Sequence, residues 1–167
     1  MRGDYENVNT ESLTELSSVL WRQVFTRFPE WQEYAEIVES EASNDLKSLY
    51  MRVQSSADER SYLSVLERGD CIEVTFSDGH PPGGAESQII CDEGLESSCV
   101  EAALEFIQEI IDEKVVIGRE RSTWLTGHKP LPPQFIASTE IGAKRRMLVS
   151  IRSWKGRYNW EQERPTC

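Results

Sequence analysis

One stretch of the chain, residues 98–116, constrains the fold more than any other. Its apolar residues recur at steps of three, one, three, three and one, which places them on one side of an α-helix. They are Val100, Ala103, Leu104, Ile107, Ile110 and Ile111. The opposite side is polar, mostly acidic, and is predicted to face water: Glu101, Glu105, Gln108, Glu109, Asp112 and Glu113. Ser98 and Glu101 have the spacing of a capping box, so the helix is predicted to begin at Ser98.

Period-two alternation elsewhere in the chain indicates β-strands. The predicted strands cover residues 49–54, 61–66, 71–77, 88–91, 115–121 and 147–154. The first three are joined by connections too short for a crossover, so they form an antiparallel meander with a turn at residues 67–70. The predicted fold class is therefore α+β. It has a mainly antiparallel sheet, made of this three-strand meander plus two later strands, and the long helix packs on one of its faces.

One or two helices are predicted before the meander. Apolar residues at helical spacing predict a helix over residues 13–27, with a second Ser-x-x-Glu cap at Ser12 and Glu15. Residues 29–40 fit either a second helix or a strand, and both interpretations stay open. Three further segments are predicted to lack regular structure, namely the flexible ends 1–9 and 159–167 and the long loop 122–144.

Length and composition restrict the classes of protein to which the chain can belong. A chain of 167 residues is expected to form one domain, residues 1–167, with a core that needs no disulfide or metal to hold it. No stretch approaches the roughly 18 apolar residues that cross a bilayer, and no signal-peptide pattern follows Met1, so a cytoplasmic protein without a membrane partner is expected. The four cysteines match no disulfide framework and are expected to be reduced thiols.

Charge is distributed unevenly along the chain. The net charge is −11; residues 1–113 carry 7 basic and 25 acidic side chains, whereas residues 114–167 carry 11 and 4. An acidic chain argues against nucleic acid as a direct partner, because phosphate contacts need clustered Lys and Arg. Two interpretations of the acidic helix stay open: a solvated face balanced by basic strands nearby, or a negative surface that steers a basic protein partner.

Catalytic and metal-binding motifs are not recognisable in the sequence. The two histidines, His80 and His128, lie in Pro/Gly-rich segments without a companion at ligand spacing. A zinc site from Cys71, His80, Cys91 and Cys99 lacks the usual knuckle spacing. We therefore expect no metal, no cofactor and no enzymatic activity. Trp124 and Trp154 lie at the edge of a loop and at a strand end, where aromatic residues fit a core or an interface.

Two short motifs carry a family resemblance. They are Ala102-Ala103-Leu104-Glu105-Phe106-Ile107 in the predicted helix and Arg152-Ser153-Trp154-Lys155-Gly156 at the end of the last strand. Together with the meander, they resemble a family of small cytosolic bacterial proteins identified as immunity proteins of polymorphic toxin systems. The resemblance spans residues 49–158. The family's aromatic–His pair after the third strand is replaced here by Ser77-Asp78-Gly79-His80-Pro81.

This resemblance implies a non-enzymatic binding protein that neutralises a cognate toxin by direct contact. Nuclease toxins are commonly basic because their substrate is a polyanion, so a basic toxin domain is the expected partner. The predicted partner-binding residues are Glu105, Glu109, Asp112, Trp124 and Trp154. Two alternatives stay open: an intracellular adaptor or regulator unrelated to toxins, and a small enzyme with its site in residues 122–144. The sequence does not indicate an oligomeric state.

Overall fold

The computed structural model describes residues 12–41, 44–77, 85–90, 96–120, 128–131 and 148–161. The chain divides into two compact units. The first comprises Met1–Val53, Ser64–Val74 and Ser87–Phe106, and the second comprises Gln54–Leu63, Thr75–Glu86 and Ile107–Cys167. Each unit has its own set of buried apolar side chains.

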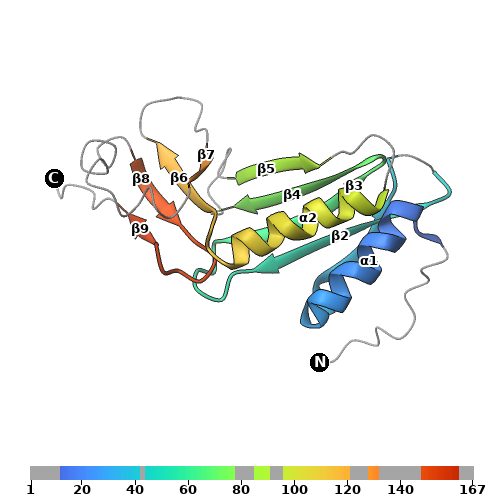
Figure 1. The fold of residues 1–167 in the computed structure, drawn as a ribbon, viewed down its shortest axis with the longest axis horizontal. Helices are drawn as coiled ribbons and strands as arrows, with labels where there is room; N and C mark the ends of the chain where they lie inside the picture. The colour runs from blue at the N-terminus through green and yellow to red at the C-terminus, as the bar shows by residue number, and fades with distance from the viewer. Residues whose placement is uncertain are drawn as a thin grey trace. The chain divides into compact units, whose positions relative to one another are not determined.

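The fold is α+β, as predicted (Figure 1). The helical elements are α1 (Glu15–Arg27), the 3₁₀ helix η3 (Pro29–Tyr34) and α2 (Glu96–Ile111). Strands β1 (Ala35–Glu39), β2 (Lys47–Gln54), β3 (Tyr62–Arg68), β4 (Cys71–Ser77) and β5 (Ala85–Ile90) form one sheet in that order. Strands β6 (Val116–Glu120), β7 (His128–Leu131), β8 (Leu148–Arg152) and β9 (Trp160–Glu161) form a second sheet in the order β7-β6-β8-β9.

The predicted meander is confirmed as β2, β3 and β4. It is extended by β1, which pairs antiparallel with β2, and by β5 on the other side. The two later strands were predicted to belong to the same sheet. They are β6 and β8, which instead pair with each other in the second sheet.

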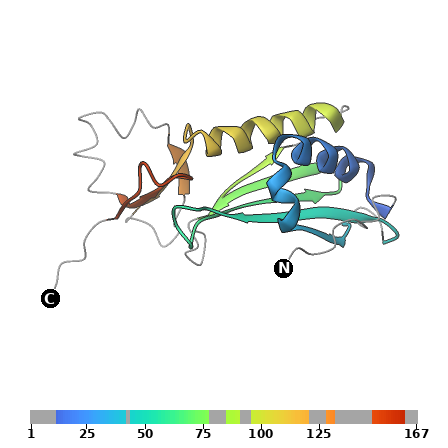
Figure 2. The same ribbon diagram turned by 90° about the horizontal axis from the view of Figure 1, so that it is seen from below.

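In the first unit, α1 and the start of α2 lie on the same face of the five-stranded sheet (Figure 2). The period of α1 places Leu16, Leu20 and Val24 against the core, as the sequence pattern predicted. The cap prediction was wrong, because Thr14 caps the helix: its Oγ1 accepts from the Ser17 backbone N–H at 3.0 Å.

Residues 29–40 combine the two structures that the sequence left open. Pro29 begins the short helix η3, and the chain then extends into β1. Trp31 is buried and its ring stacks on Phe28 with a centroid distance of 4.5 Å. The aromatic pair anchors this segment in the core.

The predicted turn at residues 67–70 was too long. Only Gly69 and Asp70 form the turn, and Gly69 has the positive φ of 71° that glycine tolerates. Glu67 and Arg68 instead continue β3. Since side chains alternate along a strand, Glu67 lies on the same side as the buried Val65 and is itself buried.

Helix α2 confirms the predicted amphipathic pattern, and its bounds differ at both ends. It begins at Glu96, so Ser98 lies inside the first turn and is not the predicted cap. It ends at Ile111, after which Glu113 adopts a φ of 58°. The N–H groups of Glu113 and Lys114 bond back to the carbonyls of Ile110 and Glu109, at 3.0 and 2.8 Å. This is the hydrogen-bond pattern of a Schellman motif, with a glutamate where glycine is usual.

The second unit contains the second sheet and the buried residues Phe76, Ile107, Ile110, Ile117 and Ile151. Residues 122–144 were predicted to be one loop, but β7 lies within them. Its Pro130 pairs with Ile117 from an edge strand, where a missing N–H is tolerated. The predicted flexible end at 159–167 was likewise wrong in part, since Trp160 and Glu161 form β9.

Candidate functional site

The polar side of α2 carries a row of exposed carboxylates. Glu101, Glu105, Glu109 and Asp112 are exposed, while Val100, Ala103, Ile107 and Ile110 on the other side are buried. Asp112 is partly compensated locally, because Gln108 Nε2 donates to it at 2.9 Å and Lys114 Nζ lies 3.7 Å away. Within the described residues, no side chain pairs with Glu101, Glu105 or Glu109. Among the described residues, these three carboxylates are left without a compensating cation.

The predicted tryptophans are not equally available. Trp154 retains 9% of its surface, and its ring packs edge-on against Phe76 with a centroid distance of 6.0 Å. Little of this side chain is left to contact a partner. Trp124 lies outside the described residues.

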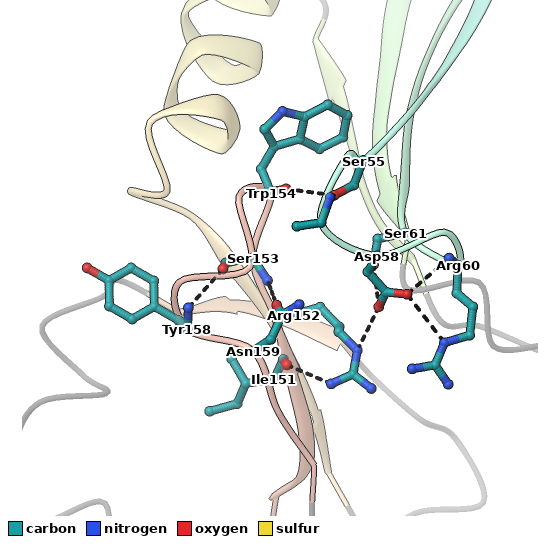
Figure 3. A network of polar contacts seen from close by, with 11 residues as sticks. Ser55, Asp58, Arg60, Ser61, Ile151, Arg152, Ser153, Trp154, Tyr158 and Asn159 are labelled. Atoms are coloured by element: carbon teal, nitrogen blue, oxygen red, sulfur yellow. Dashed lines mark hydrogen bonds and ion pairs between the residues drawn. The ribbon is translucent and has the colours of Figure 1, made fainter.

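The segment around Trp154 is tied to the loop that joins β2 and β3 (Figure 3). Ser55 Oγ donates to the Trp154 carbonyl at 2.6 Å. Arg152 Nε lies 3.1 Å from Asp58 Oδ2, with 5% and 12% of the two side chains exposed. This ion pair is therefore almost removed from water, where losing one partner leaves a buried charge.

Asp58 is held in its ionised form by a set of local donors. Burial raises the pKa of Asp58, but the Arg60 backbone N–H, the Arg60 guanidinium and the Ser61 hydroxyl together lower that pKa below its ordinary value of 3.8. Burial and hydrogen bonding thus act in opposite directions, and hydrogen bonding prevails.

The turn after Arg152 is stabilised by hydrogen bonds among its own residues. Asn159 Oδ1 accepts from the Ser153 N–H at 2.8 Å, and Ser153 Oγ accepts from the Tyr158 N–H at 3.1 Å (Figure 3). Gly156 has a φ of +75°, and a Cβ there would lie 2.9 Å from Ala57 Cβ. Glycine is therefore required at this position both by conformation and by space.

Glu113 was predicted on the water-facing side of α2, but only 2% of its surface is exposed. Its Oε1 accepts the backbone N–H groups of Lys155 and Arg157 at 3.0 and 3.2 Å, and Arg157 Nε lies 3.4 Å from Oε2. The prediction failed because the helix ends before Glu113, so the helical periodicity no longer sets its direction. The carboxylate instead occupies a concave group of backbone donors.

The left-handed conformation of Glu113 gives a direct test of this arrangement. Glu113→Gly and Glu113→Ala both lose the carboxylate, but only glycine adopts a positive φ without steric cost. We expect Glu113→Gly to be more stable than Glu113→Ala by about 1 kcal/mol in chemical denaturation. Equal stability of the two variants would contradict the left-handed geometry.

A second buried carboxylate lies in the first unit. Glu67, 1% exposed, accepts at Oε2 from the hydroxyls of Thr14, Ser17 and Ser48, the first two at 3.1 Å. Ser17 Oγ also accepts the Leu49 N–H at 2.7 Å. No described residue donates to Oε1 of Glu67. The cluster joins the start of α1 to β2 and β3. Extending the alternation of the buried residues Leu63 and Val65 by one step along β3 would have predicted that Glu67 is buried.

A shallow pocket of about 530 Å³ lies on α1. It is lined by Ser18, Trp21, Arg22, Phe25, Thr26 and Gln32. Trp21 and Phe25 meet edge to face at 4.6 Å. Among the described lining residues none is a carboxylate, a histidine or a cysteine, which gives this pocket no acid, base or thiol for catalysis.

Metal sites and membrane spans are absent from the part of the chain that the structure describes. It contains no group of three or more His, Cys, Asp or Glu side chains arranged to hold a metal ion. Cys71 and Cys99 are buried, whereas His80 and Cys91 lie outside the described residues. No helix in the described ranges has the length and apolar character to cross a membrane.

Comparison with known proteins returns no match: no family model, no curated protein and no solved structure matches this chain.

Proposed function

We propose that the protein is a non-enzymatic binding protein of the immunity type, which neutralises a basic toxin domain through the acidic side of α2. The observation that supports this proposal is the row Glu101, Glu105 and Glu109. These residues are exposed at four-residue spacing, and no described residue neutralises them.

The physical requirement on such a protein is speed as well as affinity. A toxin must be intercepted before it reaches its target, and complementary charge raises the rate of encounter by orders of magnitude over neutral association. A basic nuclease domain carries the complementary charge, because it binds polyanionic substrate. A carboxylate row on a helix whose other side is fixed in a core gives that charge a rigid support.

Glu105 and Glu109 are the central residues of the proposed surface. Asp112 is placed at its end, where Gln108 and Lys114 already engage it. Trp154 is too buried to contribute a large contact. We therefore assign the partner-binding role chiefly to the glutamates of the row.

The proposal is tested first by capture and neutralisation. Wild-type protein and the variant Glu105→Lys/Glu109→Lys are used as bait in lysate of the source organism, and captured proteins are identified by mass spectrometry. We expect a basic protein that only the wild type retains. Wild-type protein should restore growth to cells that express the isolated domain of the captured protein. A captured protein without toxicity would contradict the immunity proposal and favour an adaptor.

Charge reversal is expected to act on the association rate. At low salt, Glu105→Lys/Glu109→Lys should slow binding to the captured domain by about tenfold or more, because the steering charge is inverted. The difference should shrink as ionic strength rises, since surface charges are screened. Stopped-flow or surface-binding kinetics measure this effect.

The matched control is Glu59→Lys/Asp70→Lys, which changes the net charge equally at two exposed acids on other elements. We expect its association rate to fall much less. An association rate that does not depend on salt, or an equal loss in the control, would reject a steering role for α2.

A further inference from the structure

Strand β1 is the terminal strand of the five-stranded sheet among the described strands. It pairs only with β2, in the register that places Glu36 opposite Tyr50 and Ile37 opposite Leu49. An edge strand presents backbone N–H and C=O groups on its outer side, and these are a template for a further strand.

Exposed apolar side chains gather at this edge. The large hydrophobic residues that are exposed in the described part of the chain are Tyr34 (41%), Ile37 (36%) and Leu46 (37%). Tyr34 and Ile37 lie just before and within β1, and Leu46 lies in the connection to β2. Ile37 shares the sheet face of Leu49, which is fully buried, so the edge position leaves Ile37 uncovered.

The same segment is strongly acidic. Between Arg27 and Lys47 the sequence contains no Lys or Arg, and five exposed glutamates occur there: Glu30, Glu33, Glu36, Glu39 and Glu41. Two of them have basic partners within the unit, since Lys47 pairs with Glu39 and Arg68 with Glu41. Glu36, in the middle of the edge, has none among the described residues.

We infer that β1 binds an extended, basic peptide segment of a partner protein as an additional strand. Side chains of paired strands lie directly opposite on the same face, so the partner must match β1 residue by residue. A basic residue opposite Glu36 and apolar residues opposite Ile37 and Val38 satisfy this rule, whereas Glu39 already has Lys47 as its partner. The recognised pattern is therefore basic–apolar–apolar. A peptide with the sequence basic–apolar–apolar–basic places a basic residue opposite Glu36 in either chain direction.

Two other roles of β1 fit this composition less well: an edge strand whose charges only prevent strand pairing, and an edge strand that pairs with a second copy of the chain. Charged residues on an edge also discourage indiscriminate strand pairing, but that role does not explain why Ile37 and Tyr34 are left exposed beside them. A second copy of the chain would bring two sets of glutamates to the same edge, and like charges oppose such pairing. A basic strand would hydrogen-bond to the outer backbone groups of β1, cover its exposed apolar side chains and neutralise its negative charge.

The test uses a synthetic peptide with the sequence Thr-Lys-Val-Val-Lys-Thr, blocked at both ends, and ¹⁵N-labelled protein. We expect the peptide to shift the backbone amide signals of residues 35–39. A peptide with Glu in place of both Lys should bind at least tenfold more weakly, as should a peptide whose alternate amides are methylated on the pairing side.

The matched protein variants are Glu36→Lys and Glu59→Lys, which change net charge equally at exposed positions on β1 and in the loop between β2 and β3. Glu36→Lys should weaken peptide binding about tenfold, and Glu59→Lys about twofold or less. Shifts confined to other elements, equal loss in both variants, or unchanged binding of the methylated peptide would each overturn the inference. A dimer of the free chain that Glu36→Lys strengthens would overturn it in favour of self-pairing. None of these readouts depends on the partner being a toxin.

Discussion

Replacement of Glu67 by alanine is expected to lower the free energy of unfolding by about 3–5 kcal/mol, more than any other single substitution proposed for this protein. Glu67 is the common acceptor of the Thr14, Ser17 and Ser48 hydroxyls. Its removal leaves these buried donors without their acceptor and opens a cavity between α1 and the sheet. Urea or guanidinium denaturation, followed by circular dichroism, measures the loss.

The control for this prediction is Glu67→Gln, which preserves the shape and one acceptor oxygen. It should cost about 1–3 kcal/mol, because its amide group introduces donors into a site filled by donors. Glu59→Ala, at an exposed position, should change stability by less than about 0.5 kcal/mol. A loss below about 1 kcal/mol for Glu67→Ala would show that the cluster does not hold α1 to the sheet.

Removal of the Arg152 guanidinium has the second largest expected effect. Arg152→Ala should destabilise the protein by about 3 kcal/mol, because Asp58 then keeps a nearly buried charge without this partner. Asp58→Asn should cost a similar amount by leaving Arg152 uncompensated. The double variant should lose clearly less than the sum of the two, since the interaction is removed only once.

The pH dependence of Asp58→Asn tests whether Asp58 is ionised in the folded protein. The pKa of Asp58 lies below its ordinary value of 3.8 in the folded protein. The stabilisation from its ionised form is therefore complete above that value and is lost as the pH falls through the folded-state pKa. The difference in stability between wild type and Asp58→Asn should accordingly shrink below pH ~4. Strict additivity of the two substitutions would contradict the buried pair, and a difference independent of pH would contradict an ionised Asp58.

Periodicity was sufficient to predict both α-helices and strands β2 to β6 and β8, but β7 and β9 were not predicted and residues 29–40 were left open between helix and strand. Residues 98–116 contain the observed helix except for its first two residues, because an apolar side at helical spacing has few alternative structures. The strand at Cys71–Ser77 was predicted with its observed bounds. The division of the later strands into a second sheet was not predictable, since alternation identifies a strand but not its neighbour.

The buried polar residues were the main failures. Glu67 was assigned to a turn because glycine follows it closely, although its alternation with Val65 indicated a core-facing position. Glu113 was assigned to the exposed side because helical periodicity was extended past the end of the helix. For Glu113, the tertiary contacts of the carboxylate, which no local pattern encodes, determine where it lies.

The motif around Trp154 has a structural role that the sequence alone did not indicate. Arg152 pairs with Asp58, Gly156 packs beside Ala57, and the N–H groups of Lys155 and Arg157 hold Glu113. Each contact requires a particular residue or a particular backbone conformation. Residues 152–157 are therefore engaged in the fold.

Carboxylate footprinting tests most directly whether α2 is the binding surface. Carbodiimide coupling of an amine labels accessible Glu and Asp side chains, and peptide mass spectrometry locates the label. In the free protein we predict rapid labelling of Glu101, Glu105 and Glu109 and little labelling of Glu67 and Glu113. In complex with the captured basic domain, the three α2 residues should lose most of their labelling; unchanged labelling of Glu105 and Glu109 would contradict a binding role for this helix.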